Sequence, residues 1–203
     1  VLFYGEDALK DLAPAIQKRG LKSLLLVTDP GLVQIGLADS VKNTLTDTGL
    51  DIEICDNVHP NPIEEDVEKG ADLFTSRGCD SIVALGGGSP MDVAKVINVA
   101  TTHPAPLSQY DDAIGGGVRI VNPLAPLYAI PTTSGTGSEV GRAGVIVLRE
   151  TQRKTIIFAP ALMPHIAVLV PKLTAGLPAH ITAATGIDAF THSLEAYLAP
   201  GFH

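Results

Sequence analysis

The chain has 203 residues, a formal net charge of −8, 45% apolar residues and 18% charged residues. This length allows a sizeable buried core, and this composition is typical of a globular protein and excludes a disordered chain. The acidic balance, without any run rich in lysine and arginine, excludes nucleic acid and anionic lipid as expected partners, and no apolar stretch reaches the ~18 residues that span a bilayer.

Apolar runs and segments with helical spacing alternate along most of the chain. In chain order, the expected elements are a helix over 7–19, a strand over 21–28, a helix over 37–48, a strand over 51–55, a helix over 63–77, a strand over 81–85, a helix over 90–101, strands over 127–130 and 166–170, and between these two a hairpin over 144–148 and 154–158. This alternation predicts an α/β fold with a parallel sheet covered on both faces.

Three parts of the chain stand outside the alternation. Residues 102–122 are rich in Pro and Gly and are expected to form a long surface excursion, with His103 on the surface. From Pro178 the sequence is Ala-rich and helical almost to its end. Cys55 and Cys79 lie in unlike contexts and are expected to be reduced thiols, buried or half-buried, in a cytoplasmic protein.

The segment VALGGGSPMDVAK, residues 83–95, predicts an anion-binding loop. A buried strand ends in Gly86, Gly87 and Gly88, which let a ligand approach the backbone closely. Ser89 is expected to cap the following helix, with Asp92 as the other half of a capping box. The N–H groups at such a helix start, at the carboxyl edge of a parallel sheet, suit a phosphate. The alternative is a glycine turn without a ligand.

Asp29 ends the strand LKSLLLVTD, ahead of the glycine loop rather than about 20 residues after it, so the usual G-x-G-x-x-G arrangement does not apply. A carboxylate in this place can accept hydrogen bonds from ribose hydroxyls and would repel a 2′-phosphate, which favours NAD over NADP. The alternative is an aspartate that only forms the turn before Pro30 and Gly31.

Two further loops after strands are candidates for the same cleft. PTTSGTGSE, residues 131–139, offers hydroxyl and N–H groups that suit phosphate or ribose, although such clusters are usually plain loops. Asn61, in the segment HPNP, could reach the cleft from a third loop. His59 in that loop is expected to be a surface or packing residue rather than a catalyst.

Asp188 and His192 are spaced i, i+4 on the last predicted helix and therefore share one face. A carboxylate and an imidazole so placed make half of a divalent metal site. An isolated pair of this kind is more often a plain hydrogen bond, and the sequence offers no obvious second pair.

Together these segments resemble the iron-containing (group III) alcohol dehydrogenase family. The resemblance rests on VALGGGSPMDVAK, AIPTTSGTGSEV, APALMPHIAVLVPKLTAGLP and TAATGIDAFTHSLEAY, which occur in the family's order and spacing, and on the opening FYGEDALKDL. It implies a Rossmann-like dinucleotide-binding domain over residues 1–176 and the beginning of an all-helical, metal-binding domain over 177–203.

The resemblance also assigns residue roles. The pyrophosphate of the cofactor would lie on the glycine loop, Asp29 would meet the adenosine ribose, and Lys154 matches a basic residue that contacts the cofactor. Asp188 and His192 match the first two of four metal ligands, and His203 falls too early to be the third. The implied cofactor-binding residues are Asp29, Asn61, Gly86, Gly87, Gly88, Ser89, Asp92, Thr132, Thr133, Thr136 and Lys154.

The function implied is a cytoplasmic, NAD-dependent alcohol dehydrogenase in which Fe²⁺, or Zn²⁺ as a substitute, polarises the oxygen of a small alcohol or aldehyde. A homo-oligomer is expected. The alternatives are a hydroxyacid–oxoacid transhydrogenase, a glycerol-dehydrogenase-like or dehydroquinate-synthase-like enzyme, and a non-catalytic nucleotide-binding module. The chain is expected to be a fragment, inactive alone, that needs the rest of the helical domain and exposes the apolar face of its last helix.

Overall fold

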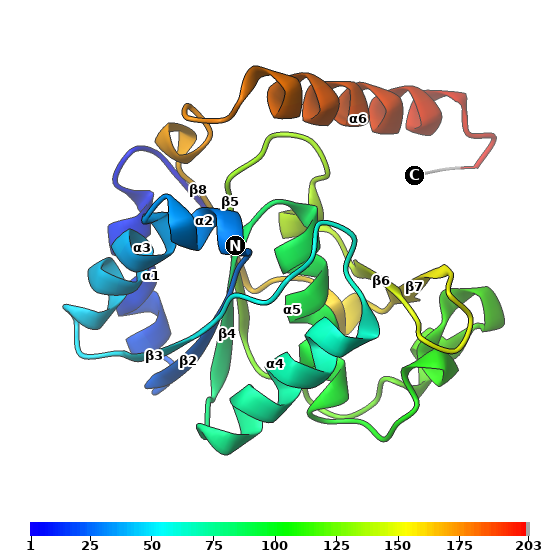
Figure 1. The fold of residues 1–203 in the computed structure, drawn as a ribbon, viewed down its shortest axis with the longest axis horizontal. Coiled ribbons are helices and arrows are strands. Elements are labelled where there is room, and N and C mark those ends of the chain that lie inside the picture. The colour runs from blue at the N-terminus through cyan, green and yellow to red at the C-terminus, as the bar shows by residue number, and fades with distance from the viewer. Residues whose placement is uncertain (202–203) are drawn as a thin grey trace.

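The computed structural model describes residues 1–201, and their framework is a six-stranded sheet in which every strand pair is parallel. The strand order is β1-β8-β5-β4-β2-β3. The strands are β1 Leu2–Tyr4, β2 Ser23–Val27, β3 Asp51–Cys55, β4 Ser81–Gly86, β5 Leu127–Pro131 and β8 Ile166–Leu169. The predicted parallel α/β fold is therefore confirmed (Figure 1).

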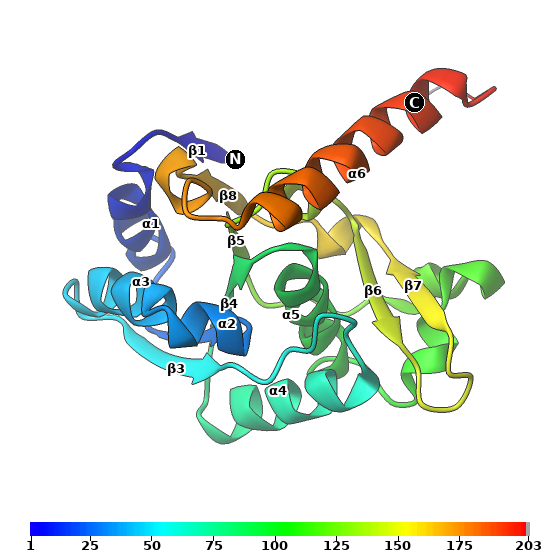
Figure 2. The same cartoon turned by 45° about the horizontal axis from the view of Figure 1, so that its top comes forward.

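Helices cover both faces of this sheet (Figure 2). They are α1 Ala8–Gln17, α2 Pro30–Gln34, α3 Leu37–Thr46, α4 Glu64–Ser76 and α5 Gly88–Ala100, whereas α6 Ala179–Leu198 lies apart from both faces and buries no residue. Alternate residues of the strands serve two separate cores. Leu24 and Leu26 of β2 pack with α1 and α3 in one core, whereas Leu25 and Val27 pack with α4 and α5 in the other. Because both faces are covered, the central strands are continuously apolar.

The order of strands makes a switch point between β2 and β4. From β2 the chain moves outward to β3, and it then returns to β4 on the other side of β2 and proceeds to β5 and β8. Loops that leave neighbouring strands at such a point diverge, which opens a crevice at the carboxyl edge of the sheet. The predicted site loops leave the sheet at this edge.

A two-stranded antiparallel hairpin, β6 Ala143–Val147 and β7 Lys154–Phe158, stands beside α5, as the sequence predicts. It is tied to the loop before α4, because Val147 N donates to Pro62 O over 2.7 Å. The excursion over residues 102–122 contains three short 3₁₀ helices and packs against β7.

The expectation that His103 lies on the surface is wrong. Only 7% of this residue is exposed. Its Nε2 accepts hydrogen bonds from the backbone N–H groups of Val121 and Asn122, both over 3.0 Å, and its Nδ1 lies 2.7 Å from Thr102 Oγ1. The imidazole thus ties the far end of the excursion back to its start, and it is covered in doing so.

The predicted elements agree with the structure to within a few residues, with two additions. β1 pairs with β8 at the edge of the sheet, and α2 begins at Pro30, where the sequence suggests a break. Both cysteines are buried free thiols, as expected. Within residues 1–201, no helix combines the length and the apolar character needed to cross a membrane.

Candidate functional site

The glycine loop joins β4 to α5 in a single tight turn. Gly86 has φ +144°, a conformation that side chains rarely adopt, and a Cβ there would lie 2.7 Å from Pro90 Cγ. A Cβ on Gly88 would lie 3.0 Å from Thr136 Cγ2. The glycines are therefore required by backbone conformation and by the close approach of a second loop.

The start of α5 differs from the expected cap. Gly87 occupies the N-cap position and no side chain caps the helix. Ser89 lies within the first turn and its hydroxyl donates to Pro60 O over 2.9 Å. Asp92 does not reach back to the cap but accepts from Ser138 Oγ over 2.8 Å. The predicted roles of Ser89 and Asp92 in capping are therefore wrong, and no side-chain oxygen caps the first N–H groups of α5.

The loop over 131–138 packs directly on the glycine loop. Thr132 N donates to Gly86 O over 3.0 Å, and a Cβ added to Gly87 or to Gly88 would lie 3.3 Å from Thr133 Cγ2 or 3.0 Å from Thr136 Cγ2. The two loops that the sequence singles out are thus brought together. Hydroxyl groups and helix-start N–H groups on one surface can bind an anion such as a phosphate.

A buried hydrogen-bond network fixes this second loop to α5. Lys95 is fully buried, and its ammonium group donates to Ser138 Oγ (2.7 Å), Ser138 O (2.8 Å) and Ala143 O (2.8 Å). Burial lowers the pKa of Lys95 to about 8, against the opposing attraction of Asp92 and Glu139. Burial raises the pKa of Asp92, while its bond to Ser138 and the charge of Lys95 act in the opposite direction.

Asp29 follows β2 and caps α2, since its Oδ1 accepts from Leu32 N over 3.1 Å. The turn-forming role that the sequence left as an alternative is therefore present in the structure. The hydrogen bond from Leu32 N occupies one of the two oxygens of the Asp29 carboxylate. The adjacent residue Thr28 is fully buried, and its hydroxyl has no hydrogen-bond partner within the described residues.

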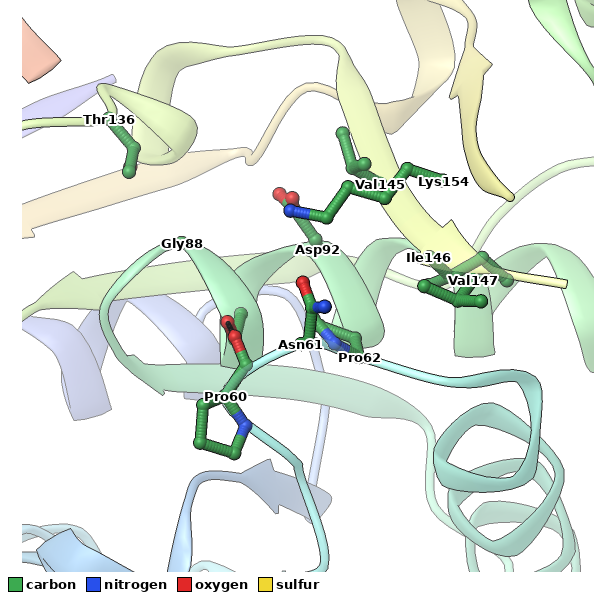
Figure 3. A pocket seen from close by; sticks show the side chains of 11 residues that line it. Pro60, Asn61, Pro62, Gly88, Asp92, Thr136, Val145, Ile146, Val147 and Lys154 are labelled. Atoms are coloured by element: carbon green, nitrogen blue, oxygen red, sulfur yellow. Dashed lines mark hydrogen bonds between the residues drawn. The ribbon is translucent and has the colours of Figure 1, made fainter. Parts of the chain in front are cut away.

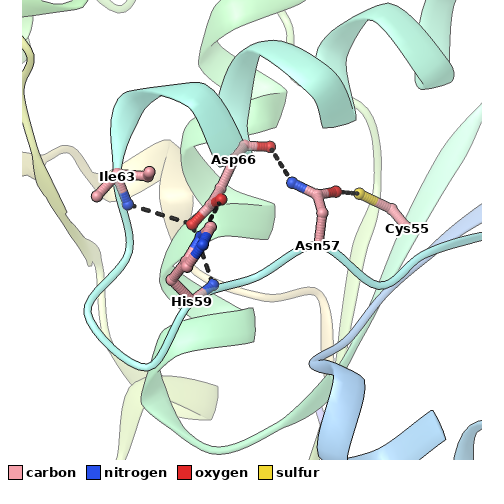
Figure 4. Close-up of polar contacts among 5 residues, drawn as sticks. All are labelled: Cys55, Asn57, His59, Ile63 and Asp66. Carbon is pink, nitrogen blue, oxygen red and sulfur yellow. Dashed lines mark hydrogen bonds and ion pairs between the residues drawn. The ribbon is translucent and has the colours of Figure 1, made fainter.

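The loop between β3 and α4 carries Asn61. Asp66, fully buried in the first turn of α4, accepts from His59 and Ile63 (Figure 4). Asn57 accepts from the Cys55 thiol over 3.0 Å at the end of β3. His59 is largely exposed and paired with Asp66, which agrees with its expected place on the surface.

A cavity of about 160 Å³ lies where these loops meet the hairpin. Figure 3 shows Lys154 and Val145 of the hairpin on one side and Pro60, Asn61 and Pro62 on the other. The predicted residues that line it are Asn61, Gly88, Ser89, Asp92, Thr136 and Lys154. The same two loops carry the other predicted residues beside the cavity, namely Gly86, Gly87, Thr132 and Thr133. Asp29 follows β2, the strand next to β4.

Asp188 and His192 lie on α6, which crosses above the carboxyl edge of the sheet (Figure 1). Their side chains approach each other, with Oδ1 and Nε2 3.6 Å apart, and both are partly exposed. A carboxylate and an imidazole on one exposed face suit a divalent cation such as Fe²⁺ or Zn²⁺. In the part of the chain that the structure describes, no group of three or more His, Cys, Asp or Glu could hold a metal. His203 lies outside the described residues.

Sequence reasoning missed three residues that shape this site, namely Lys95, Ser138 and Asp66. A lysine inside the apolar run VAKVIN and an aspartate in the first turn of a helix were the available signals. Neither signal predicts which residue the side chain contacts. Ser138, for example, lies 43 residues from Lys95 in the sequence.

The parallel sheet, with a glycine-containing helix start at its switch point, places the chain among the Rossmann-like α/β proteins. Residues 1–171 match the family model of the iron-containing alcohol dehydrogenases. The chain belongs to this family, and the resemblance seen in the sequence is confirmed.

Comparisons with individual proteins agree with this family assignment. The chain is 43% identical over 196 residues to a 4-hydroxybutyrate dehydrogenase of Cupriavidus necator. This match covers 97% of the chain and 50% of the relative. A solved 1,3-propanediol oxidoreductase matches with a TM-score of 0.92 and 39% identity, over 100% of this chain and 52% of that one. A sulfoacetaldehyde reductase from Bifidobacterium kashiwanohense, solved in complex with NAD⁺, matches with a TM-score of 0.87 and 27% identity, over 100% of this chain and 53% of that one. The chain therefore spans about half the length of these relatives.

Proposed function

We propose that this chain is the NAD-binding portion of a metal-dependent alcohol dehydrogenase. The observation that carries the proposal is the close approach of two loops, in which Thr132 N donates to Gly86 O and Thr133 and Thr136 leave no free space for side chains on Gly87 and Gly88, at the uncapped start of α5. This surface would hold the pyrophosphate, with its negative charge near the helix N-terminus. The NAD⁺ complex of a structurally similar reductase supports this choice of cofactor.

The other predicted residues take complementary roles in this proposal. Lys154 would offer a positive charge across the cavity, Asn61 would approach the cofactor from the opposite wall, and Thr132 would line the cleft. Asp29 would use its remaining acceptor capacity for the ribose, which favours NAD over NADP. These assignments follow from the family resemblance and from the positions of the loops at one edge of the sheet.

The metal site is proposed on Asp188 and His192. Both would supply ligands to Fe²⁺, with Zn²⁺ as the substitute, and the remaining ligands would come from outside residues 1–201. When bound, the metal would supply Lewis-acid polarisation of a substrate oxygen, and the nicotinamide would supply the hydride chemistry. The residues of the chain itself would bind and orient the cofactor. A small alcohol or aldehyde is the proposed substrate, since the relatives are named for several such compounds.

A domain boundary near residue 176 is part of the proposal. The two cores extend from Ala8 to Val170, whereas α6 has no buried residue. Five large apolar residues of α6 are exposed, namely Ile187, Phe190, Leu194, Tyr197 and Leu198. We propose that α6 begins an all-helical domain that covers this surface, that the whole protein is a homo-oligomer, and that it acts in the cytoplasm, where its two thiols stay reduced.

NADH titration, followed by fluorescence, tests the proposal. Gly88→Ala should weaken NADH binding by roughly tenfold or more, because the added Cβ would meet Thr136 Cγ2 at 3.0 Å and would stand on the surface proposed for the pyrophosphate. Gly176→Ala is the matched control, since a Cβ there meets open space. NADH binding that Gly88→Ala leaves unchanged would contradict the proposed site.

Activity requires a second measurement, because two metal ligands do not complete a catalytic centre. Turnover of an alcohol panel with NAD⁺ and Fe²⁺ should appear in a chain extended to the length of the relatives. If the extended chain binds NADH and metal but oxidises none of the alcohols, the non-catalytic nucleotide-binding alternative is favoured.

A further inference from the structure

The loop from His59 to Ile63 cannot stabilise its own shape through the backbone. Its sequence is HPNPI, and the two prolines carry no N–H group. The remaining backbone donors belong to His59, Asn61 and Ile63. Three consecutive residues on the cavity wall, Pro60, Asn61 and Pro62, therefore depend on partners outside the loop for their position.

Asp66 is the partner of two of these three donors. Its Oδ2 accepts from His59 N over 3.1 Å and from Ile63 N over 3.2 Å. Its Oδ1 accepts from His59 Nδ1 over 2.7 Å (Figure 4). The carboxylate is fully buried, although the His59 side chain beside it is 57% exposed. A buried carboxylate that accepts three hydrogen bonds fixes the groups that donate them.

The carbonyl groups of the same loop point to two other elements of the site. Pro60 O accepts from Ser89 Oγ in the first turn of α5, and Pro62 O accepts from Val147 N at the end of β6. The loop is therefore held on one side by Asp66 and on the other by the glycine-loop helix and the hairpin. Any shift of its His59 end would move Asn61 relative to Gly88 and Lys154 across the cavity.

We propose that Asp66 is a positioning residue for the cofactor, which acts by holding the His59–Ile63 loop so that Asn61 faces the nucleotide. This inference rests on the proposed NAD-binding function and assigns to it a buried residue that does not line the cavity. Asp66 would not touch the cofactor. Its role would be to keep one wall of the site in place before the nucleotide arrives, which reduces the ordering cost of binding.

The substitution Asp66→Asn separates positioning from packing. Asparagine has nearly the same shape, but it offers one acceptor oxygen and places an NH₂ group against donors. Asp72→Asn is the matched control, because Asp72 lies on the same helix and is exposed. NADH affinity of the folded protein should fall by at least tenfold in Asp66→Asn and stay within twofold of wild type in Asp72→Asn.

Two further measurements make the role of the loop specific. Hydrogen exchange should rise at the amides of His59 and Ile63 in Asp66→Asn, with exchange in β4 and β5 unchanged. In addition, the losses of affinity from Asp66→Asn and Asn61→Ala should be non-additive by at least threefold, since both act on one contact. A merely structural role would lower the melting temperature and would also raise exchange at these two amides, but the losses of affinity from Asp66→Asn and Asn61→Ala would then be additive.

The outcomes distinguish this inference from the function on which it rests. Wild-type NADH affinity in Asp66→Asn, additive losses, or unchanged exchange at His59 and Ile63 would each overturn the positioning role. If wild type fails to bind NADH, the proposed function fails, whereas the exchange measurement still tests the hold of Asp66 on the loop. If Asp66→Asn does not fold, His59→Ala removes the exposed partner alone and should weaken NADH binding by twofold to fivefold. Unchanged affinity in that variant would contradict the proposal.

Discussion

Lys95 Nζ lies 2.7 Å from Ser138 Oγ, and both groups are buried beneath the two loops of the candidate site. Ser138 Oγ in turn donates to Asp92, so one hydroxyl connects a cation and a carboxylate on successive turns of α5. This contact joins the glycine-loop helix to the loop that carries Thr132, Thr133 and Thr136. The geometry of the proposed anion-binding surface therefore depends on Lys95, a buried residue that does not line the cavity.

Lys95 should leave a signature in the pH dependence of stability. Its folded-state pKa of about 8 lies below the ordinary value of 10.5 because of burial. Between these values the unfolded chain binds more protons than the folded one, so the contribution of Lys95 to the free energy of unfolding rises with pH. The rise is on the order of 3 kcal/mol. Urea unfolding from pH 7 to pH 10.5 should show wild type gaining stability relative to Lys95→Met. If the difference in free energy of unfolding between wild type and Lys95→Met were constant across this range, Lys95 would have the same pKa in the folded and the unfolded chain.

Asp29 should control the choice between NAD and NADP. Asp29→Asn keeps an oxygen for the cap on Leu32 N but removes the charge that would repel a 2′-phosphate. The ratio of NADPH to NADH affinity should rise roughly tenfold. Asp29→Gly should raise the same ratio and should destabilise the protein by only a few tenths of a kcal/mol, because glycine is itself tolerated at an N-cap. An unchanged ratio in both variants would show that Asp29 is only a turn former.

His192→Ala should lower metal content without weakening NADH binding. The substitution removes one of the two donors that lie 3.6 Å apart on α6. Metal analysis after incubation with Fe²⁺, in the chain extended to the length of the relatives, should show at least a tenfold loss of bound metal. His180→Ala on the same helix is the control. Retention of one metal per chain in His192→Ala would remove His192 from the ligand set.

Cys55 should be unreactive in the folded protein. Burial raises the pKa of its thiol to about 11, and burial also raises the pKa of Cys79. At pH 8 the thiolate fraction of Cys55 is then about a hundredfold lower than that of an ordinary cysteine. Reaction with a disulfide reagent should be slow in native buffer and should release two equivalents promptly in guanidinium. Rapid native reaction that Cys55→Ser abolishes would contradict this assignment.

Local patterns were sufficient to predict the framework of the fold. Continuous apolar runs identified β2 and β4, since strands buried on both faces have no polar alternation. β1 was missed because three residues at a sheet edge carry too little pattern. α2 was missed because Pro30 reads as a break, although a proline directly after a capping aspartate also begins a helix.

The candidate site was predictable where glycines and hydroxyl residues follow strands, and unpredictable where side chains act over long sequence distances. The glycine loop was found from its strand and helix, yet the cap fell on Gly87 rather than Ser89. Ser89 has a different partner because Pro60 O lies nearby in space, 29 residues earlier in the sequence. His103 was misplaced for the same reason, since its burial depends on backbone donors at residues 121 and 122.

The pairing of β1 with β8 has a consequence for the order in which the chain folds. Leu2, Phe3 and Tyr4 pair with Ala167, Val168 and Leu169, at the opposite end of the α/β portion. As the ribosome releases the chain, the first strand has no neighbour in the sheet until almost all of the other strands have been made. Closing so long a loop is slow compared with forming the adjacent β2–β3 and β2–β4 pairs. We therefore expect β1 to be among the last strands to join the sheet.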